Sequence, residues 1–171
     1  MRVSSNTMTA VVSVLLATQV FAEENPYLTQ EASFEGPYRA TVVRVIDADT
    51  IEVSVDLWPS LIQTATVRVR GIDAPETRST CETEKALGIE AKEWVEKMYP
   101  VGEVIRIEDV EHDSLSRYVA EVKRWRSDRW LPLDNELLEK DYAEIWYPGQ
   151  QDIPWCLISQ ERAAQGQGTQ P

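Results

Sequence analysis

Carboxylates gather in two short segments, the first acidic loop (residues 47–50) and the second acidic loop (residues 71–77). Asp47 and Asp49 lie in the first, and Asp73 and Glu76 lie in the second. Oxygen ligands from converging loops suit a hard cation such as Ca²⁺, and neither loop holds a thiol or an imidazole that would favour a softer metal. Each loop also has a structural interpretation, because Asp-x-Asp is a turn sequence and Asp73 could cap a helical turn.

Two arginines accompany these carboxylates. Arg68 lies five residues before Asp73, on the polar face of an expected strand, and Arg117 begins another expected strand. A divalent cation and two guanidinium groups form a clamp for a phosphate that gains charge in its transition state. A carboxylate beside the cation could then activate or orient water. The combination therefore points to metal-assisted chemistry at a phosphate.

The composition limits the alternatives. The 171 residues include 17 Lys and Arg against 29 Asp and Glu, a formal net charge of −12, with one His and two Cys. One His and two Cys exclude a His-rich or a four-thiolate zinc site. The negative charge disfavours a protein that coats nucleic acid through a basic surface. The length and the 43% of hydrophobic residues suit one globular domain.

The N-terminal residues predict a signal peptide over residues 1–22. Arg2 precedes an apolar run, and Ala22 ends that run before two glutamates. This is the order of a charged end, an apolar stretch and a small residue at a cleavage site. The run is shorter than the roughly 20 residues that span a bilayer. We therefore expect a protein exported to the periplasm or the medium, with no membrane segment after cleavage; a buried helix or an uncleaved anchor is the alternative.

Export also bears on the two cysteines, Cys81 and Cys156. In an oxidising compartment the two thiols could form a disulfide, and the bond would stabilise the fold by about 4 kcal/mol if it were unstrained. Two unpaired thiols are the alternative, because sequence does not give the distance between them.

Secondary-structure patterns predict a small barrel. Alternating apolar residues and β-branched residues indicate five strands, with a helix inserted after the third and a short second helix after the fifth. The strands are expected at about 38–46, 50–55, 64–70, 103–108 and 117–125, and the helices at about 79–98 and 134–140. Ser79 and Glu82 are expected to form a capping box, and Asp134 an N-cap.

This order of elements indicates an α+β, mainly β fold built on a five-stranded barrel of the OB type. A plain α+β sandwich is the alternative. The expected domain covers residues 38–158, after a flexible segment at 23–37 and before a Gln- and Gly-rich tail at 159–171 that we expect to be disordered.

Four separated motifs resemble the staphylococcal nuclease, or thermonuclease, family. They are Val-Ile-Asp-Ala-Asp-Thr at 45–50, Arg-Val-Arg-Gly-Ile-Asp-Ala-Pro-Glu-Thr at 68–77, Asp-Ser-Leu-Ser-Arg-Tyr-Val-Ala at 113–120 and Asn-Glu-Leu-Leu at 135–138. The resemblance covers residues 38–147. It implies an OB-fold, Ca²⁺-dependent phosphodiesterase that acts on DNA and RNA and leaves 3′-phosphates.

The resemblance also implies a metal site for one Ca²⁺. Asp49 and Asp73 would be direct ligands, the backbone carbonyl of Ala74 would be a third, and Asp47 would support the site from the outer shell. The long C-terminal helix of the family's best-known member is expected to be missing, because only 15 residues follow Cys156.

The catalytic side chains implied by the resemblance are Arg68, Glu76 and Arg117. Glu76 would activate water, and the two arginines would hold the scissile phosphate and stabilise its transition state. Ser116 stands where the family usually has Gly, so a turn with positive φ would be strained there and could misplace Arg117.

The expected partner is a nucleic acid, with single strands favoured, and the protein is expected to be a monomer. A basic stretch at 123–130 interleaves four cationic residues with Trp125 and Trp130. It could stack on bases and contact phosphates, or form a hairpin with one solvated face. The alternative to a nuclease is a binding module, which is an OB barrel that holds nucleic acid or another ligand without turnover.

Overall fold

The computed structural model describes residues 36–114 and 117–167. The predicted signal peptide, nearly all of segment 23–37 and Ser116 lie outside the described residues. No helix within the described ranges is long and apolar enough to cross a bilayer. The elements in chain order are β1 Tyr38–Asp47, β2 Thr50–Trp58, β3 Leu61–Val69, β4 Ile72–Asp73, α2 Glu82–Met98, β5 Val104–Ser114, β6 Arg117–Arg126, β7 Arg129–Pro132, α3 Leu133–Glu139, β8 Glu144–Ile145 and α4 Trp155–Gln167.

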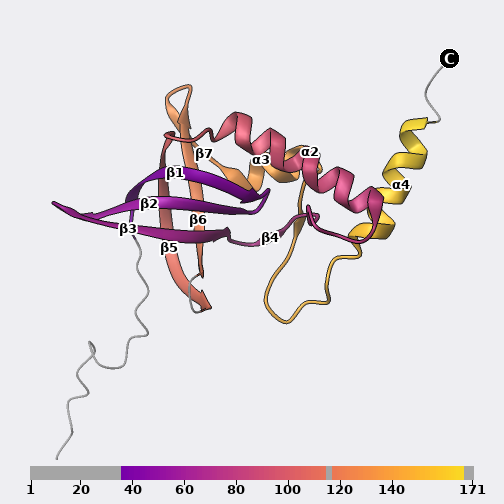
Figure 1. The fold of residues 1–171 in the computed structure, drawn as a ribbon, viewed down its shortest axis with the longest axis horizontal. Coiled ribbons are helices and arrows are strands. Elements are labelled where there is room, and N and C mark those ends of the chain that lie inside the picture. Colours follow the sequence, from indigo (N-terminus) through magenta and orange to yellow (C-terminus); the bar gives the residue numbers. More distant parts are fainter. Residues whose placement is uncertain (1–35, 115–116, 168–171) are drawn as a thin grey trace, which may run out of the picture. The chain divides into compact units, whose positions relative to one another are not determined.

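Five of these strands close into a barrel, which confirms the predicted α+β, mainly β, OB-type fold (Figure 1). The order around the sheet is β3-β2-β1-β5-β6, and a parallel pairing between β3 and β6 closes it. Strands β1, β2 and β3 form an antiparallel meander. The short strand β7 extends the sheet beyond β6, and a separate pair, β4 with β8, lies outside the barrel.

The barrel interior is filled by alternate residues of each strand. On β2, Ile51, Val53 and Val55 are buried, and on β3, Val67 and Val69 are buried. Successive side chains of a strand point to opposite faces, so this spacing turns the branched residues inward and leaves Arg68 on the other face. The same alternation that builds the core therefore places Arg68 at the site described below.

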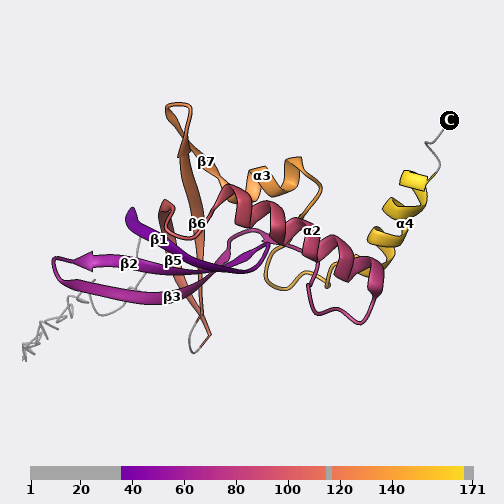
Figure 2. The same ribbon diagram turned by 45° about the horizontal axis from the view of Figure 1, so that its top comes forward.

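Helix α2 links the barrel to α4 (Figures 1 and 2). Its buried residues are Gly88, Ala91 and Val95, and the helix contacts both β1 and α4. The predicted capping box is wrong: the N-cap is Cys81, which has no side-chain cap. The Ser79 hydroxyl instead donates a hydrogen bond to Glu84 over 2.8 Å.

Helix α3 begins at Leu133, one residue before the expected N-cap Asp134, and Pro132 is its N-cap. Pro132 has an extended backbone (φ −72°, ψ 134°), as an N-cap residue does, so the first helical residue is Leu133. Strands β6 and β7 form a hairpin, one of the two alternatives for the basic stretch at 123–130. Ser127 and Asp128 both have positive φ there, as a tight hairpin turn between twisted strands requires.

The expectation of a disordered tail from residue 159 is wrong as far as Gln167, and so is the expectation that a C-terminal helix is missing. Helix α4 covers Trp155–Gln167. Trp155 and Ser159 are buried, and the Ser159 hydroxyl lies 3.0 Å from the Thr83 hydroxyl beside the start of α2. Gln, Glu, Arg and Ala favour helix once one end of the segment is held. That anchor is a tertiary contact, which composition does not show.

Cys81 and Cys156 form a disulfide, with their Cα atoms 5.8 Å apart. This confirms the paired alternative for the two cysteines. The bond joins the residue before α2 to the second residue of α4. The two helices are thereby tied at the end of α2 that lies away from the barrel (Figure 2).

Candidate active site

The first acidic loop is the tight turn that joins β1 to β2. Asp47 pairs with Thr50 across this turn. The carbonyl of Asp49 accepts a hydrogen bond from the backbone N–H of Val69 over 2.8 Å, so the turn is fixed against the end of β3. Asp49 itself is 5% exposed, and its carboxylate accepts a hydrogen bond from the Thr50 hydroxyl over 2.8 Å. The loop therefore presents a buried, oriented carboxylate.

Arg68 brings the two acidic loops together. Its Nη2 lies 3.2 Å from Oδ2 of Asp49 and 2.5 Å from Oδ1 of Asp73. A second link joins the loops, because the Thr77 hydroxyl donates a hydrogen bond to Oδ1 of Asp47. Residues 24 positions apart in the chain thus share one guanidinium nitrogen.

Asp73 is held on both of its carboxylate oxygens. Oδ1 contacts Arg68, and Oδ2 accepts a hydrogen bond from the indole Nε1–H of Trp155 over 2.8 Å. The Asp73 backbone pairs with Glu144 where β4 meets β8. Sequence reasoning missed Trp155, because it lies 82 residues along the chain from Asp73 and in a segment expected to end the domain.

Close packing against α2 supports the second acidic loop. A Cβ atom at Gly88 would lie 2.6 Å from the carbonyl oxygen of Pro75, and 2.9 and 3.0 Å from the carbonyl carbon and oxygen of Glu76. Real Cβ atoms do not approach so closely, so only glycine lets the loop backbone rest on the helix. The position of Glu76 therefore depends on the missing side chain at residue 88.

Negative charge is concentrated between the loops. Burial raises the pKa of Glu76, and the neighbouring carboxylates of Asp47, Asp49 and Asp73 raise it further. Burial also raises the pKa of Asp49, against the opposite effect of Arg68. Burial lowers the pKa of Arg68, but Asp49 and Asp73 outweigh it, so the net shift is upward. Four carboxylates share one guanidinium, an imbalance that a divalent cation would neutralise.

The oxygen donors fit a hard cation better than a transition metal. Ala74, whose carbonyl is the expected third ligand, is buried next to Asp73. The described residues contain no group of three or more His, Cys, Asp or Glu side chains arranged to hold a metal. The set expected here differs from such a group, since it combines two carboxylates with one carbonyl. Arg68 now contacts both carboxylates, so it would have to withdraw partly as a cation entered.

A cavity of about 890 Å³ opens beside this cluster. It is lined by Arg68, Asp73, Glu76 and Arg117, so these four predicted site residues face one space. Asp47, Asp49 and Ala74 are not among the lining residues. Arg117 is half-exposed and forms an ion pair with Asp113, with 2.5 Å between Nε and Oδ2.

Aromatic side chains line another part of the same cavity: Trp146, Tyr147 and Trp155. The Arg68 guanidinium lies 6.0 Å from the ring centre of Trp146. Sequence reasoning did not place any of these rings at the site, because they belong to a segment without regular periodicity. A cavity with cationic and aromatic walls can take both a phosphate and the base or sugar attached to it.

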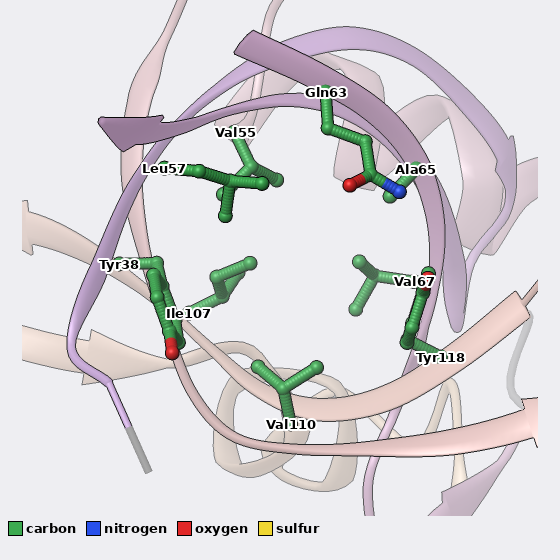
Figure 3. A pocket seen from close by; sticks show the side chains of 9 residues that line it. All are labelled: Tyr38, Val55, Leu57, Gln63, Ala65, Val67, Ile107, Val110 and Tyr118. Carbon is green, nitrogen blue, oxygen red and sulfur yellow. The ribbon is translucent and has the colours of Figure 1, made fainter. Parts of the chain in front are cut away.

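A second cavity, of about 160 Å³, lies inside the barrel (Figure 3). Its lining side chains come from β1, β2, β3, β5 and β6 and are mostly apolar, among them Val55, Val67 and Ile107. No carboxylate, arginine or lysine lines it. It therefore lacks groups for phosphate chemistry, and the larger cavity is the candidate site.

The basic stretch at 123–130 is mostly engaged within the protein. Lys123 forms ion pairs with Glu108 and Glu121, Arg124 with Glu136, and Arg126 with Glu103. Arg124 is 8% exposed. Trp125 and Trp130 pack edge to face across the hairpin. These contacts favour the interpretation of a structural hairpin over that of a surface for nucleic acid.

A closed barrel with two acidic loops and two arginines beside one cavity defines a nuclease-like OB domain. The chain belongs to the family described as Staphylococcal nuclease homologue, whose model matches residues 66–169. This confirms the resemblance seen in the motifs. The chain is also 28% identical over 85 residues to "Probable endonuclease LCL3" of Eremothecium gossypii. The match covers 50% of this chain, and the chain spans only 30% of that relative's length.

Proposed function

We propose that this chain is an exported, Ca²⁺-dependent nuclease that hydrolyses phosphodiester bonds of DNA or RNA and leaves 3′-phosphates. The observation that carries the proposal is the shared cavity of Arg68, Asp73, Glu76 and Arg117, with Asp49 tied to Arg68 beside it. The family and the name of the endonuclease relative support a nuclease-like function, at the level of the family.

Asp49, Asp73 and the Ala74 carbonyl would hold the cation, and Asp47, fixed by Thr77, would support them. When bound, Ca²⁺ would neutralise part of the carboxylate charge and that of the phosphate. The Arg68 guanidinium, freed in part from the two carboxylates, would then donate to a phosphate oxygen. Arg117 would do the same after loosening its contact with Asp113.

Glu76 is the proposed proton acceptor. Its raised pKa makes its carboxylate a stronger base than that of an ordinary glutamate. The attacking water would lose a proton to Glu76 as its oxygen bonds to phosphorus. The bond from phosphorus to the 5′ oxygen would break, and that oxygen would take up a proton from solvent water. The products are a 3′-phosphate and a 5′-hydroxyl, with the developing charge stabilised by Arg68 and Arg117.

A cleavage assay tests the proposal. Wild type should cleave single-stranded DNA in Ca²⁺, chelator should abolish cleavage, and Glu76→Gln and Arg68→Ala should each lower the rate by about 100-fold or more. Glu93→Gln on the exposed face of α2 and Arg129→Ala are the matched controls and should keep the wild-type rate.

Two outcomes would contradict parts of the proposal. Intact binding without cleavage in Ca²⁺, Mg²⁺ and Mn²⁺ would favour the binding module over the nuclease. If Glu76→Gln and Arg68→Ala cleave as fast as wild type, the proposed site is wrong, while the proposed nuclease activity still stands. Comparing single-stranded with double-stranded DNA and with RNA in the same assay gives the substrate preference.

The export proposal rests on the N-terminal sequence and gains support from the Cys81–Cys156 disulfide. Such bonds persist in the periplasm and in secreted proteins, whereas the bacterial and eukaryotic cytosol keeps most thiols reduced. Both described cysteines take part in the bond.

A further inference from the structure

The indole of Trp155 makes one hydrogen bond, and its acceptor is Asp73. Tryptophan has a single donor, the indole Nε1–H, and here it donates to Oδ2 of Asp73 over 2.8 Å. Trp155 is 4% exposed, so water competes little for its indole N–H. An ionised carboxylate has about four lone-pair sites, which leaves room for a cation beside the indole and Arg68.

The indole is itself held from two sides. The next residue, Cys156, is bonded to Cys81 at the start of α2. One face of the Trp155 ring lies 5.9 Å from the guanidinium of Arg162, two turns along α4. Arg162 also pairs with Glu144, whose backbone pairs with Asp73. A closed set of contacts thus runs from Asp73 through α4 and back to the strand that carries Asp73.

We propose that Trp155 is a positioning residue for Asp73, and that the Cys81–Cys156 disulfide holds Trp155 in that role, so that the state of the disulfide regulates the site. The inference rests on the proposed function, in which Asp73 binds Ca²⁺. A hydrogen bond on the outer side of a ligand fixes its orientation, and losing such a bond lowers metal affinity by about 10- to 100-fold.

The first test replaces the indole with a ring that cannot donate. Trp155→Phe should weaken Ca²⁺ binding by about 10- to 100-fold in calorimetry, with the circular dichroism spectrum of a folded protein. Trp94→Phe, in the α2 face that packs on Tyr142, is the matched control and should bind Ca²⁺ as wild type does. Wild-type affinity in folded Trp155→Phe would overturn the proposal.

A second readout needs neither metal nor substrate. The indole N–H signal of Trp155 in a ¹H–¹⁵N spectrum is assigned by its loss in Trp155→Phe. Asp73→Asn should move that signal because the acceptor loses its charge, whereas Asp152→Asn should leave it in place. If the Trp155 indole signal keeps its chemical shift in Asp73→Asn, the positioning role is overturned.

The disulfide is tested with the double variant Cys81→Ser/Cys156→Ser and by reducing the wild type. Each should shift the Trp155 signal and weaken Ca²⁺ binding, and adding Trp155→Phe to the double variant should cause little further loss because both act through the same hydrogen bond. Wild-type affinity and an unmoved signal in the double variant would overturn the regulatory part. Wild type that binds Ca²⁺ without cleaving nucleic acid would reject the proposed function and leave the positioning role supported.

Discussion

At the scale of single residues, the candidate site depends both on the contacts of Arg68 and on the lack of a side chain at Gly88. Arg68 connects Asp49 and Asp73, and its place on β3 follows directly from the alternation of that strand. Gly88 contributes by having no side chain, which lets Pro75 and Glu76 rest on α2. The position of Arg68 can be predicted from the alternation of residues along its strand. The role of Gly88 can be recognised only from the structure, where the backbones of the loop and the helix are in contact.

Gly88→Ala should destabilise the protein by about 1–3 kcal/mol, because its Cβ would overlap the Pro75 carbonyl and force the loop or helix to shift. The same change in an unobstructed helix stabilises by about 1 kcal/mol, so the sign alone is informative. Urea denaturation measures it. Activity should fall as well, because Glu76 moves with the loop. Glu93→Ala, on the exposed face of α2, is the control, and a Gly88→Ala protein more stable than wild type would contradict the close packing.

At the scale of elements, α2 is the part that connects the others. Its last turns lie beside the barrel and its first turns beside α4 (Figure 1). Tyr99, after its last residue, is fully buried and donates a hydrogen bond to Glu136 of α3 over 2.8 Å. Glu90, midway along the helix, accepts a hydrogen bond from the hydroxyl of Tyr142 over 2.8 Å. Both polar contacts join α2 to the segment around α3.

The contact between Tyr142 and Glu90 predicts a pH dependence at alkaline pH. Burial raises the pKa of Tyr142 to about 12, and the hydrogen bond to the Glu90 carboxylate adds to the shift. Because the pKa is higher in the folded chain than the value of about 10 in an unfolded chain, the contact stabilises the fold fully below about pH 10 and is lost as the pH rises toward 12.

Tyr142→Phe should therefore be less stable than wild type below pH 10, and the difference should shrink as the pH approaches 12. Thermal denaturation across this range measures the effect. An ultraviolet titration of Glu90→Gln gives an independent check, because removing the carboxylate should lower the pKa of Tyr142. A difference between Tyr142→Phe and wild type that grows above pH 10 would contradict the assigned sign.

The barrel strands could be predicted from the sequence because each strand carries its own alternation of buried apolar residues. Ile51, Val53 and Val55 alternate on β2, and Val67 and Val69 on β3. The six-residue and ten-residue motifs around Asp49 and Asp73 likewise lie where strands end. Helix α4 could not be predicted, because its formation depends on the burial of Trp155 and on a bond to Cys81, 75 residues away. The aromatic side chain of Trp146 was not placed at the site because its segment has no regular periodicity.

At the scale of the whole molecule, net charge and local charge act in opposite directions. The chain carries a formal net charge of −12, so its long-range field repels nucleic acid. Most cations of the basic stretch at 123–130 pair with acidic residues. The arginines that line the larger cavity are Arg68, Arg70 and Arg117. Binding of a substrate must therefore be local and weak.

The affinity for single-stranded DNA should fall with salt, but only with a shallow slope. Two phosphate contacts, from Arg68 and Arg117, give a slope of about −1.4 in a plot of log affinity against log salt concentration. Fluorescence anisotropy measures this slope with Glu76→Gln, which we expect to bind DNA and to cleave it at least about 100-fold more slowly than wild type. Arg117→Ala should roughly halve the slope, and a slope several times steeper would mean that a wider basic surface takes part in binding.

The bond between Cys81 and Cys156 also has a consequence for the cell that makes the protein. On the proposed export, a chain still in a reducing cytosol would lack this bond, and Trp155 would not be held in its proposed role of positioning Asp73. On the proposed function, the newly made enzyme would meet the nucleic acids of its own cell before its catalytic site is finished. Oxidation after export would then act as a maturation step, and the host would be spared without a separate inhibitor.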